Sequence, residues 1–116
     1  MLFRSEEALK KLAVVLENKK DINIMVEGHT DNVPIQGTLS SGAKDNWDLS
    51  VLRATSVVKI ITKNSGIDPI RISASGRGPY FPLDPASNVE ARRKNRRTEI
   101  ILTPKLDELL KVLESN

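Results

Sequence analysis

Apolar residues recur at intervals of three and four along several segments of the chain, which is the spacing of one face of an α-helix. The most regular of these segments begins at Asn46, the expected N-cap, and is expected to end in a left-handed cap over residues 64–66. A shorter helix is expected to begin after Asn88 as its N-cap. The predicted helices therefore cover residues 5–18, 46–64, a short segment after Asn88, and 104–114.

Between these helices, apolar and polar residues alternate one by one, which is the period of a β-strand with one buried face. Ile22, Ile24 and Val26 form the first such series, and it ends at Gly28. The predicted strands cover residues 22–28, 70–75 and 97–102. This order of elements predicts an α+β fold, a two-layer βαβαβ-type sandwich with its helices packed on one face of a small mixed sheet.

Length and composition are typical of a single globular domain. The chain has 116 residues, of which 39% are hydrophobic and 28% are charged. No apolar run approaches the ~20 residues of a membrane-spanning helix, and the first residues lack the apolar segment and cleavage site of a signal peptide. Without cysteine, neither a disulfide nor a thiolate metal site can form. We expect residues 1–116 to be one domain, with its core at 5–103, excised from a longer protein.

Polar loops follow the first two predicted strands, and such loops often carry functional groups. His29 and Asp31 lie in the first loop, with serines after them, and these are the residue types of a hydrolytic triad. However, the two are only two positions apart and the chain has no G-x-S-x-G nucleophile turn, so no enzyme is predicted. Because His29 is the only histidine and no acid-rich calcium loop occurs, no metal or other cofactor is expected. The His29 side chain is instead predicted to bond to the loop backbone.

A cluster of basic residues precedes the third predicted strand, in a chain with a net charge of +3 and a pI near 9.3. Nucleic-acid binding through this basic run, residues 92–97, is therefore an alternative function. Aromatic residues, which stack on single-stranded bases, make up only 3% of the chain, with Tyr80 and Phe81 as the only adjacent pair. In a strand, Arg96 and Arg97 would point to opposite faces and could not both join one site. Nucleic acid is thus the alternative partner and not the predicted one.

Four motifs occur in one order along the chain: GHTDN (28–32), NWDLSVLRA (46–54), GRGPYFP (76–82) and KNRRTEIIL (94–102). Together they resemble the OmpA-like peptidoglycan-binding domain, which is shared by OmpA-type outer-membrane proteins, the Pal lipoprotein and the flagellar stator protein MotB. The resemblance covers residues 5–103, and the long loop together with Trp47 is most similar to MotB-like and long-loop OmpA members. Two features depart from the family: Ala91 replaces a common glycine, and the edge strand before the first helix would be shortened to residues 1–4.

In such domains the ligand is the diaminopimelate of the peptidoglycan stem peptide, whose side chain ends in an ammonium and a carboxylate on one carbon. The resemblance implies that Asp31 accepts from the ammonium and that Arg53 binds the carboxylate in a bidentate manner. The alternative is that Asp31 and Arg53 simply pair with each other. The resemblance also places Asn46 and Arg96 in the pocket, with Thr30, Asn32, Leu49 and Asn95 as supporting residues.

The function implied by this resemblance is non-catalytic binding of diaminopimelate-type peptidoglycan. Such binding would anchor an outer-membrane or other envelope protein to the cell wall, with the domain in the periplasm. A β-barrel, a lipoprotein anchor or a stator-type transmembrane helix would each fit upstream, so membrane attachment is expected only through segments outside this chain. The residues predict neither the oligomeric state nor the role of the loop over residues 32–45.

Overall fold

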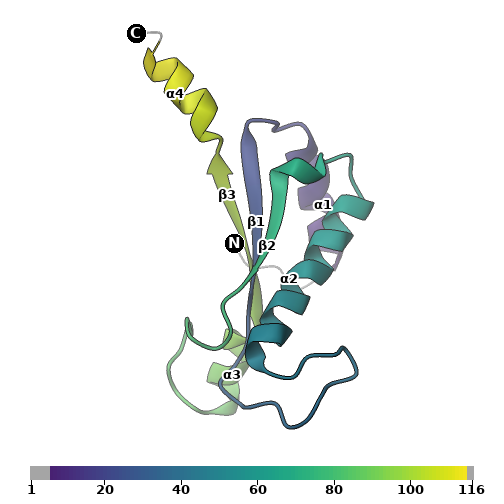
Figure 1. The fold of residues 1–116 in the computed structure, drawn as a ribbon, viewed down its shortest axis with the longest axis vertical. Helices are drawn as coiled ribbons and strands as arrows, with labels where there is room; N and C mark the ends of the chain where they lie inside the picture. The colour runs from purple at the N-terminus through teal and green to yellow at the C-terminus, as the bar shows by residue number, and fades with distance from the viewer. Residues whose placement is uncertain (1–5, 115–116) are drawn as a thin grey trace.

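The computed structural model describes residues 6–114, and for residues 106–109 the backbone only. The predicted shortening of an edge strand to residues 1–4 lies outside the described residues. Helices and strands alternate along the chain, as predicted (Figure 1). In order they are α1 (Glu6–Glu17), β1 (Ile22–His29), α2 (Asn46–Lys63), the 3-10 turn η1 (Pro69–Arg71), β2 (Ile72–Gly76), α3 (Val89–Asn95), β3 (Arg97–Pro104) and α4 (Leu106–Glu114).

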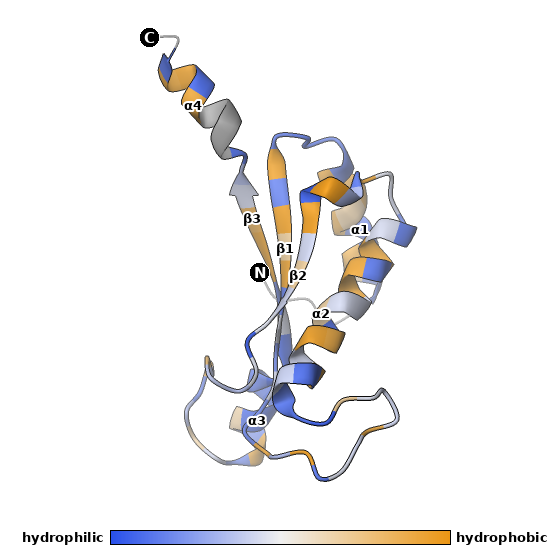
Figure 2. Ribbon diagram, in the orientation of Figure 1, coloured by the Kyte–Doolittle hydropathy of each residue, from blue (hydrophilic) through white to orange (hydrophobic). Residues whose placement is uncertain are grey.

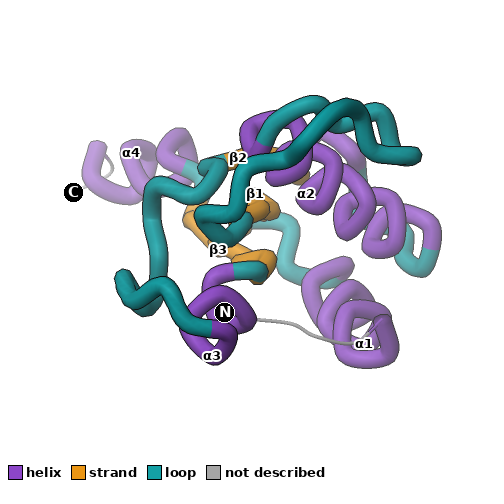
Figure 3. The backbone as a smooth tube through the Cα atoms, turned by 90° about the horizontal axis from the view of Figure 1, so that it is seen from below, coloured by secondary structure: helices purple, strands orange, loops and turns teal. Residues whose placement is uncertain are grey.

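The strands form one mixed sheet in the order β2-β1-β3. β1 runs parallel to β2 and antiparallel to β3, so that Gly28 pairs with Gly76 on one side and with Thr98 on the other. Parallel neighbours need a crossover connection, and α2 supplies it between β1 and β2. Figure 3 shows α1 and α2 on the same side of the sheet, which confirms the predicted two-layer α+β architecture.

The core lies between the sheet and the two long helices. Side chains alternate across a strand, so Ile24, Val26 and Ile100 share the face that packs on α1 and α2. Figure 2 shows apolar segments in the strands and in both helices, and more hydrophilic strand ends near α3. The buried core consists of Leu9, Ala13, Leu16, Ile24, Val26, Ala54, Ile61, Ile67 and Ile100.

The predicted strand over residues 70–75 begins two residues late, because the turn Pro69–Arg71, capped by the Asp68 carboxylate, precedes it. In the predicted strand the apolar side chain of Ile70 would be buried and that of Arg71 exposed, and the turn reverses both. Ile70 is 86% exposed, whereas Arg71 is only 4% exposed. A buried guanidinium requires acceptors, and Arg71 has three backbone carbonyls at the end of α1 and the start of β1, those of Leu16, Lys19 and Ile22.

Both ends of α2 differ from the predicted caps. The N-cap is Asp45 and not Asn46, and the Asp45 carboxylate accepts a hydrogen bond from the Asp48 amide at 2.8 Å. The side chain of Asn46 is therefore available to other partners. The predicted left-handed cap is also wrong, because Asn64 has a φ of −102° and Gly66 is not among the described glycines with positive φ.

The last two helices follow the prediction in part. Asn88 is the N-cap of α3, as predicted, and accepts from the Ala91 amide at 2.8 Å. Pro104, predicted to open the C-terminal helix, instead ends β3, and α4 begins at Leu106. Figure 1 shows α4 extending away from the sheet, in a molecule that measures 54 × 30 × 23 Å. No helix within residues 6–114 has the length and apolar character needed to span a bilayer.

Candidate functional site

One end of the sheet gathers the loops that carry the sequence motifs. β1 and β2 are parallel and therefore finish at the same edge, where the antiparallel β3 begins. The N-terminus of α2 and the short helix α3 lie at this end as well (Figure 1). The four motifs are thus neighbours in space although they span residues 28–102 in sequence.

Two glycines allow α2 to lie directly on the strands at this end. A Cβ atom added to Gly28 would stand 2.0 Å from the Ser50 carbonyl oxygen, and one added to Gly76 would stand 2.5 Å from the Ser50 hydroxyl oxygen. These distances are too short for any larger residue without movement of the helix or strands. The close approach brings Arg53 of α2 over the end of β1, where its guanidinium donates to the His29 carbonyl at 3.0 Å.

The buried Ser50 also ties the GRGPY loop to this end of the sheet. Its hydroxyl donates to the Trp47 carbonyl at 2.9 Å and accepts from the Gly78 amide at 3.0 Å. The Gly78 carbonyl accepts from the Thr30 amide at 3.0 Å. Because these bonds come from α2 and from the end of β1, they hold the GRGPY and GHTDN loops side by side.

A hollow of about 450 Å³ opens between these loops and the first turns of α2. It is lined by every residue predicted for the diaminopimelate site except Asn32 and Asn95. The other lining residues come from the long loop after Asp31. None of these loop residues was predicted from the sequence, where their only sign is a few apolar residues within an otherwise polar loop. The lining residues are Thr30, Asp31, Val33, Pro34, Ile35, Gln36, Leu39, Asn46, Leu49, Arg53 and Arg96.

Asp31 forms an ion pair with Arg96. Its Oδ2 accepts from the Arg96 guanidinium at 2.8 Å, and its Oδ1 accepts from the Val33 amide at 3.0 Å in a tight turn. The alternative ion pair between Asp31 and Arg53 is not formed among the described side chains. A carboxylate offers about four acceptor positions, so Asp31 keeps capacity for an additional donor.

Arg53 is half-buried and has no ion-pair partner among the side chains that the structure describes. Burial lowers the pKa of its guanidinium below the ordinary value, Asp31 opposes this shift, and Arg96 adds to it. A lowered pKa means that the folded domain disfavours this cation relative to water. A bound anion would therefore stabilise the positive charge of Arg53, which no side chain of the described residues pairs with.

Asn46 and Thr30 hold the start of the long loop in place. The Asn46 side-chain nitrogen donates to the carbonyls of Val33 at 3.1 Å and Asp31 at 3.4 Å. The Thr30 hydroxyl donates to the same Asp31 carbonyl at 2.9 Å. These bonds connect the loop that carries Asp31 to the helix that carries Arg53, so the two opposite charges face one hollow.

Asn32 and Asn95 lie outside this hollow. Asn32 is exposed and bonds to the Ser87 hydroxyl and the Arg92 guanidinium, each at 3.4 Å. Asn95 is buried and holds the proline-rich loop in place. Its side-chain oxygen accepts from the Leu83 amide at 2.8 Å, and its side-chain nitrogen donates to the Asp84 carbonyl at 2.9 Å. The structure therefore gives Asn95 contacts that support a loop and none that reach the hollow.

The ring of His29 lies on the sheet face opposite the helices, beside two glutamates. Its Nε2 is 2.8 Å from Glu27 and 3.0 Å from Glu99, so the predicted bond from this ring to the loop backbone is wrong. These three side chains also form a set that could ligate a metal ion. However, Arg77 and Arg97 pair with the two glutamates at 3.3 and 3.5 Å, so the cluster already has balanced charge.

The basic run does not form one continuous surface. Arg96 pairs with Asp31 at the hollow, whereas Arg97 donates to the Phe81 carbonyl at 2.9 Å and is largely buried. Arg93 forms an exposed ion pair within α3. Arg96 and Arg97 therefore bind at different places, but strand alternation is not the reason, because Arg96 is the C-cap of α3 and β3 begins at Arg97.

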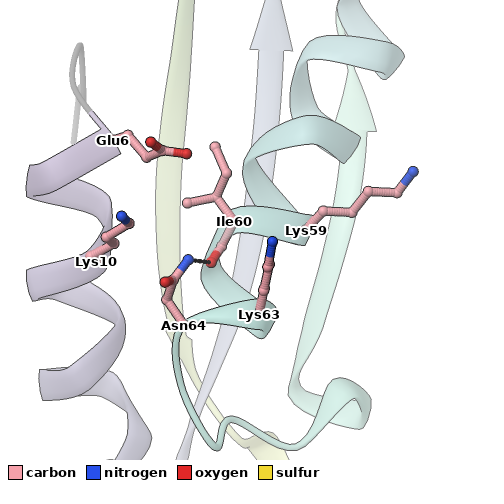
Figure 4. Close-up of a pocket in the computed structure, with 6 residues that line it drawn as sticks. All are labelled: Glu6, Lys10, Lys59, Ile60, Lys63 and Asn64. Carbon is pink, nitrogen blue, oxygen red and sulfur yellow. Dashed lines mark hydrogen bonds between the residues drawn. The ribbon is translucent and has the colours of Figure 1, made fainter.

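A second hollow lies between α1 and the C-terminal part of α2 (Figure 4). Lys10, Lys59 and Lys63 line it, and a hydrogen bond from Asn64 to the Ile60 carbonyl at 2.7 Å closes the end of α2 beside it. Figure 4 shows Lys59 directed away from Lys10, so the ammonium groups do not converge on one point. Glu6 lines this hollow beside the three lysines, so it also contains both signs of charge, but none of the four sequence motifs contributes a residue to it.

Comparison with known proteins gives consistent matches at the level of both sequence and fold. A profile of the OmpA family matches residues 4–96. Motility protein B of Bacillus subtilis is 36% identical over 83% of this chain and 36% of that protein, so the chain spans about a third of this relative. The C-terminal domain of Helicobacter pylori MotB has a TM-score of 0.75 at 27% identity, over 97% of this chain and 84% of that one. The cell wall anchor of the T6SS from Pseudomonas aeruginosa has a TM-score of 0.71 at 32% identity, over 86% and 66%.

Proposed function

Because the chain belongs to the OmpA family, we propose that it is a non-catalytic peptidoglycan-binding domain that anchors an envelope protein to the cell wall. Its similarity to MotB and to a cell wall anchor supports this proposal. The observation that carries it is a pair of opposite charges at one hollow. Arg53 is half-buried there without an ion-pair partner among the described side chains, and Asp31 lines the same hollow.

Diaminopimelate is the ligand that this arrangement supports best. Its side-chain carboxylate matches the bidentate fork of Arg53, and its ammonium matches the remaining acceptor positions of Asp31. Leu49 and the apolar residues of the long loop provide contacts for the aliphatic part of the ligand. Lysine has the ammonium but not the carboxylate, so it would leave Arg53 without a partner.

A single site of this kind should bind weakly. Two or three charge-assisted hydrogen bonds contribute about 1.5 to 3 kcal/mol each, whereas association costs at least about 4 kcal/mol in lost freedom. We therefore expect micromolar or weaker affinity. Such affinity is sufficient for a domain tethered beside a continuous polymer, because the effective concentration of ligand is high.

The proposed location is the periplasm, where an envelope protein meets peptidoglycan. The chain spans about a third of its Bacillus subtilis relative, so the activity of that whole protein is not assigned to this domain. A β-barrel, a lipid anchor or a transmembrane helix in such a segment would each place this domain beside the wall.

The alternative of nucleic-acid binding gains no support from the basic run. A phosphate-binding surface needs several cations on one face. Here Arg96 and Arg97 are engaged with different partners, and Arg97 is largely buried. Only the exposed residues of α3 remain for such a surface.

Sedimentation of the purified domain with two kinds of sacculi tests the proposal. We expect retention on diaminopimelate-type wall at least about tenfold greater than on lysine-type wall, since the latter lacks a bidentate charge-assisted contact. Equal retention would contradict the diaminopimelate assignment, and no retention on either wall would contradict wall binding itself. Binding to single-stranded DNA that exceeds binding to sacculi at physiological salt would favour the alternative function.

A further inference from the structure

A third hollow, of about 320 Å³, adjoins the proposed diaminopimelate site. The two hollows share Pro34, Ile35 and Asn46 in their walls. The adjoining one extends from these shared residues to the rings of Trp47 and Tyr80. The proposed function makes no use of this aromatic wall, although the GRGPY motif contributes one of its two rings.

The aromatic wall is exposed although its residues are large and apolar. Trp47 is 51% exposed and Tyr80 is 61% exposed, and their ring centroids are 5.1 Å apart with an angle of 38° between the planes. Burial of such rings would contribute substantially to stability. Exposed rings gathered beside a hollow are therefore a feature of binding surfaces.

The two rings are held in place before any ligand binds. Trp47 lies in the first turn of α2, and the loop that carries Tyr80 is fixed by the hydrogen bonds of Gly78 to Ser50 and Thr30. Gly78 has a φ of +59°, and a Cβ atom added to it would stand 3.2 Å from the Tyr80 ring. Glycine thus allows the ring to lie against the loop, and a preformed surface loses little freedom on binding.

The rim of this hollow is polar. Asn32, Asp45 and Asn46 line it together with the two rings. Side-chain amides and a carboxylate together offer both donors and acceptors. One face of a pyranose ring presents C–H groups, whose hydrogens are attracted to the negative face of an aromatic ring, while the hydroxyl and acetamido groups at its edge need such donors and acceptors. The hollow therefore combines the two features that suit a sugar.

We propose that Trp47 and Tyr80 form a subsite for a sugar ring of the peptidoglycan glycan strand. This inference rests on the proposed function, because it assigns the two adjoining hollows to two parts of one polymer. Two residues of the stem peptide separate diaminopimelate from the sugar that carries the stem, and two extended residues span about 7 Å before the groups that link them at either end are added. A stem bound at Arg53 would thus bring its own sugar to the neighbouring hollow.

Binding of three soluble probes tests the subsite: a stem peptide without sugar, a disaccharide carrying the same stem, and the disaccharide alone. Trp47 is the only tryptophan, so its fluorescence reports on the hollow directly. We expect the disaccharide-stem compound to bind about three- to tenfold more tightly than the stem peptide, and only probes that contain sugar to change the emission.

Tyr80→Ala should abolish this difference and leave the affinity for the stem peptide unchanged. Phe81→Ala is the matched control, because Phe81 is 54% exposed in the same loop but does not line the hollow. Thermal melts show whether each variant is folded, and Trp47→Ala, measured by calorimetry, should reproduce the effect of Tyr80→Ala.

Equal affinities of the wild type for the stem peptide and the disaccharide-stem compound would overturn the subsite while leaving the diaminopimelate site intact. The same conclusion would follow if Tyr80→Ala weakened binding of the stem peptide and of the disaccharide-stem compound equally, or if neither probe that contains sugar changed the Trp47 emission. Failure of the stem peptide to bind the wild type would instead contradict the proposed function.

Discussion

Arg53 and Asp31 carry opposite charges at one hollow, but their surroundings differ. Asp31 already binds the Arg96 guanidinium and the Val33 amide, so its charge and position are supported from two sides. Arg53 has a hydrogen bond to the His29 carbonyl and no ion pair within the described side chains. The site therefore favours an anion over a cation.

Replacement of either charge should separate binding from folding. Arg53→Ala removes the bidentate partner of the ligand carboxylate and leaves Asp31 to repel that carboxylate, whereas Asp31→Ala removes only the partner of the ammonium. We expect both changes to weaken binding about tenfold or more, with Arg53→Ala at least as damaging. Because neither side chain belongs to the core, unfolding free energies should change by less than about 1 kcal/mol. Peptidoglycan pull-downs and thermal melts measure the two quantities.

Arg93→Ala is the matched control for these substitutions. It removes the same charge as Arg53→Ala, but Arg93 is exposed and pairs only within α3. It should leave wall binding unchanged. If the melting temperature of Arg53→Ala or Asp31→Ala fell together with binding, the pair would be a structural element and the site assignment would be wrong.

At the scale of elements, the contact between α2 and β1 decides where the site forms. Helices usually pack on a sheet through side chains, but here the Ser50 carbonyl would be only 2.0 Å from a Cβ atom at Gly28. The helix backbone therefore rests almost directly on the strand. This contact determines how close Arg53 and Asn46 of α2 lie to the loop that carries Asp31.

Gly28→Ala should accordingly damage both stability and binding. The methyl group would meet backbone atoms of α2 that cannot move without the whole helix, and we expect a loss of about 3 kcal/mol or more in unfolding free energy. Urea unfolding and sacculus binding provide the measurements.

Gly42→Ala is the control at this scale. Gly42 has a φ of +94°, but a Cβ atom added to it would have no neighbouring atom within 4 Å. Only backbone strain of about 1 kcal/mol is therefore expected. A Gly28 variant as stable as the Gly42 variant would contradict the close packing of α2 on β1.

The whole molecule consists of a compact body and one projecting helix. The buried core draws on α1, α2, β1, β3 and the segment after α2, and α4 contributes no described residue to it. Removal of residues 107–116 should therefore change the unfolding free energy by less than about 1 kcal/mol and leave wall binding intact, because the hollow lies at the other end of the sheet. Thermal melts and sedimentation of the shortened chain test this. A large loss of stability would show that α4 packs on the body in solution.

Local patterns in the sequence determined most of the secondary structure. Helical and strand periods are properties of short segments, so α1, β1 and α2 were predicted within a residue or two. The resemblance to the OmpA family further predicted that Asp31, Arg53, Asn46 and Arg96 lie together, and all four line one hollow. Their role toward a ligand stays a prediction.

Only the tertiary structure decided which partner each polar group takes. Asp31 pairs with Arg96 across 65 positions of sequence, Arg71 is buried by carbonyls of α1 and β1, and His29 lies between two glutamates. Each of these choices depends on strand order and register, which bring distant residues within about 3 Å of one another. Residue type and local period carry no information on such distances. From the sequence alone a charged side chain is predicted to be exposed, because its burial is favourable only where the fold provides a partner for the charge.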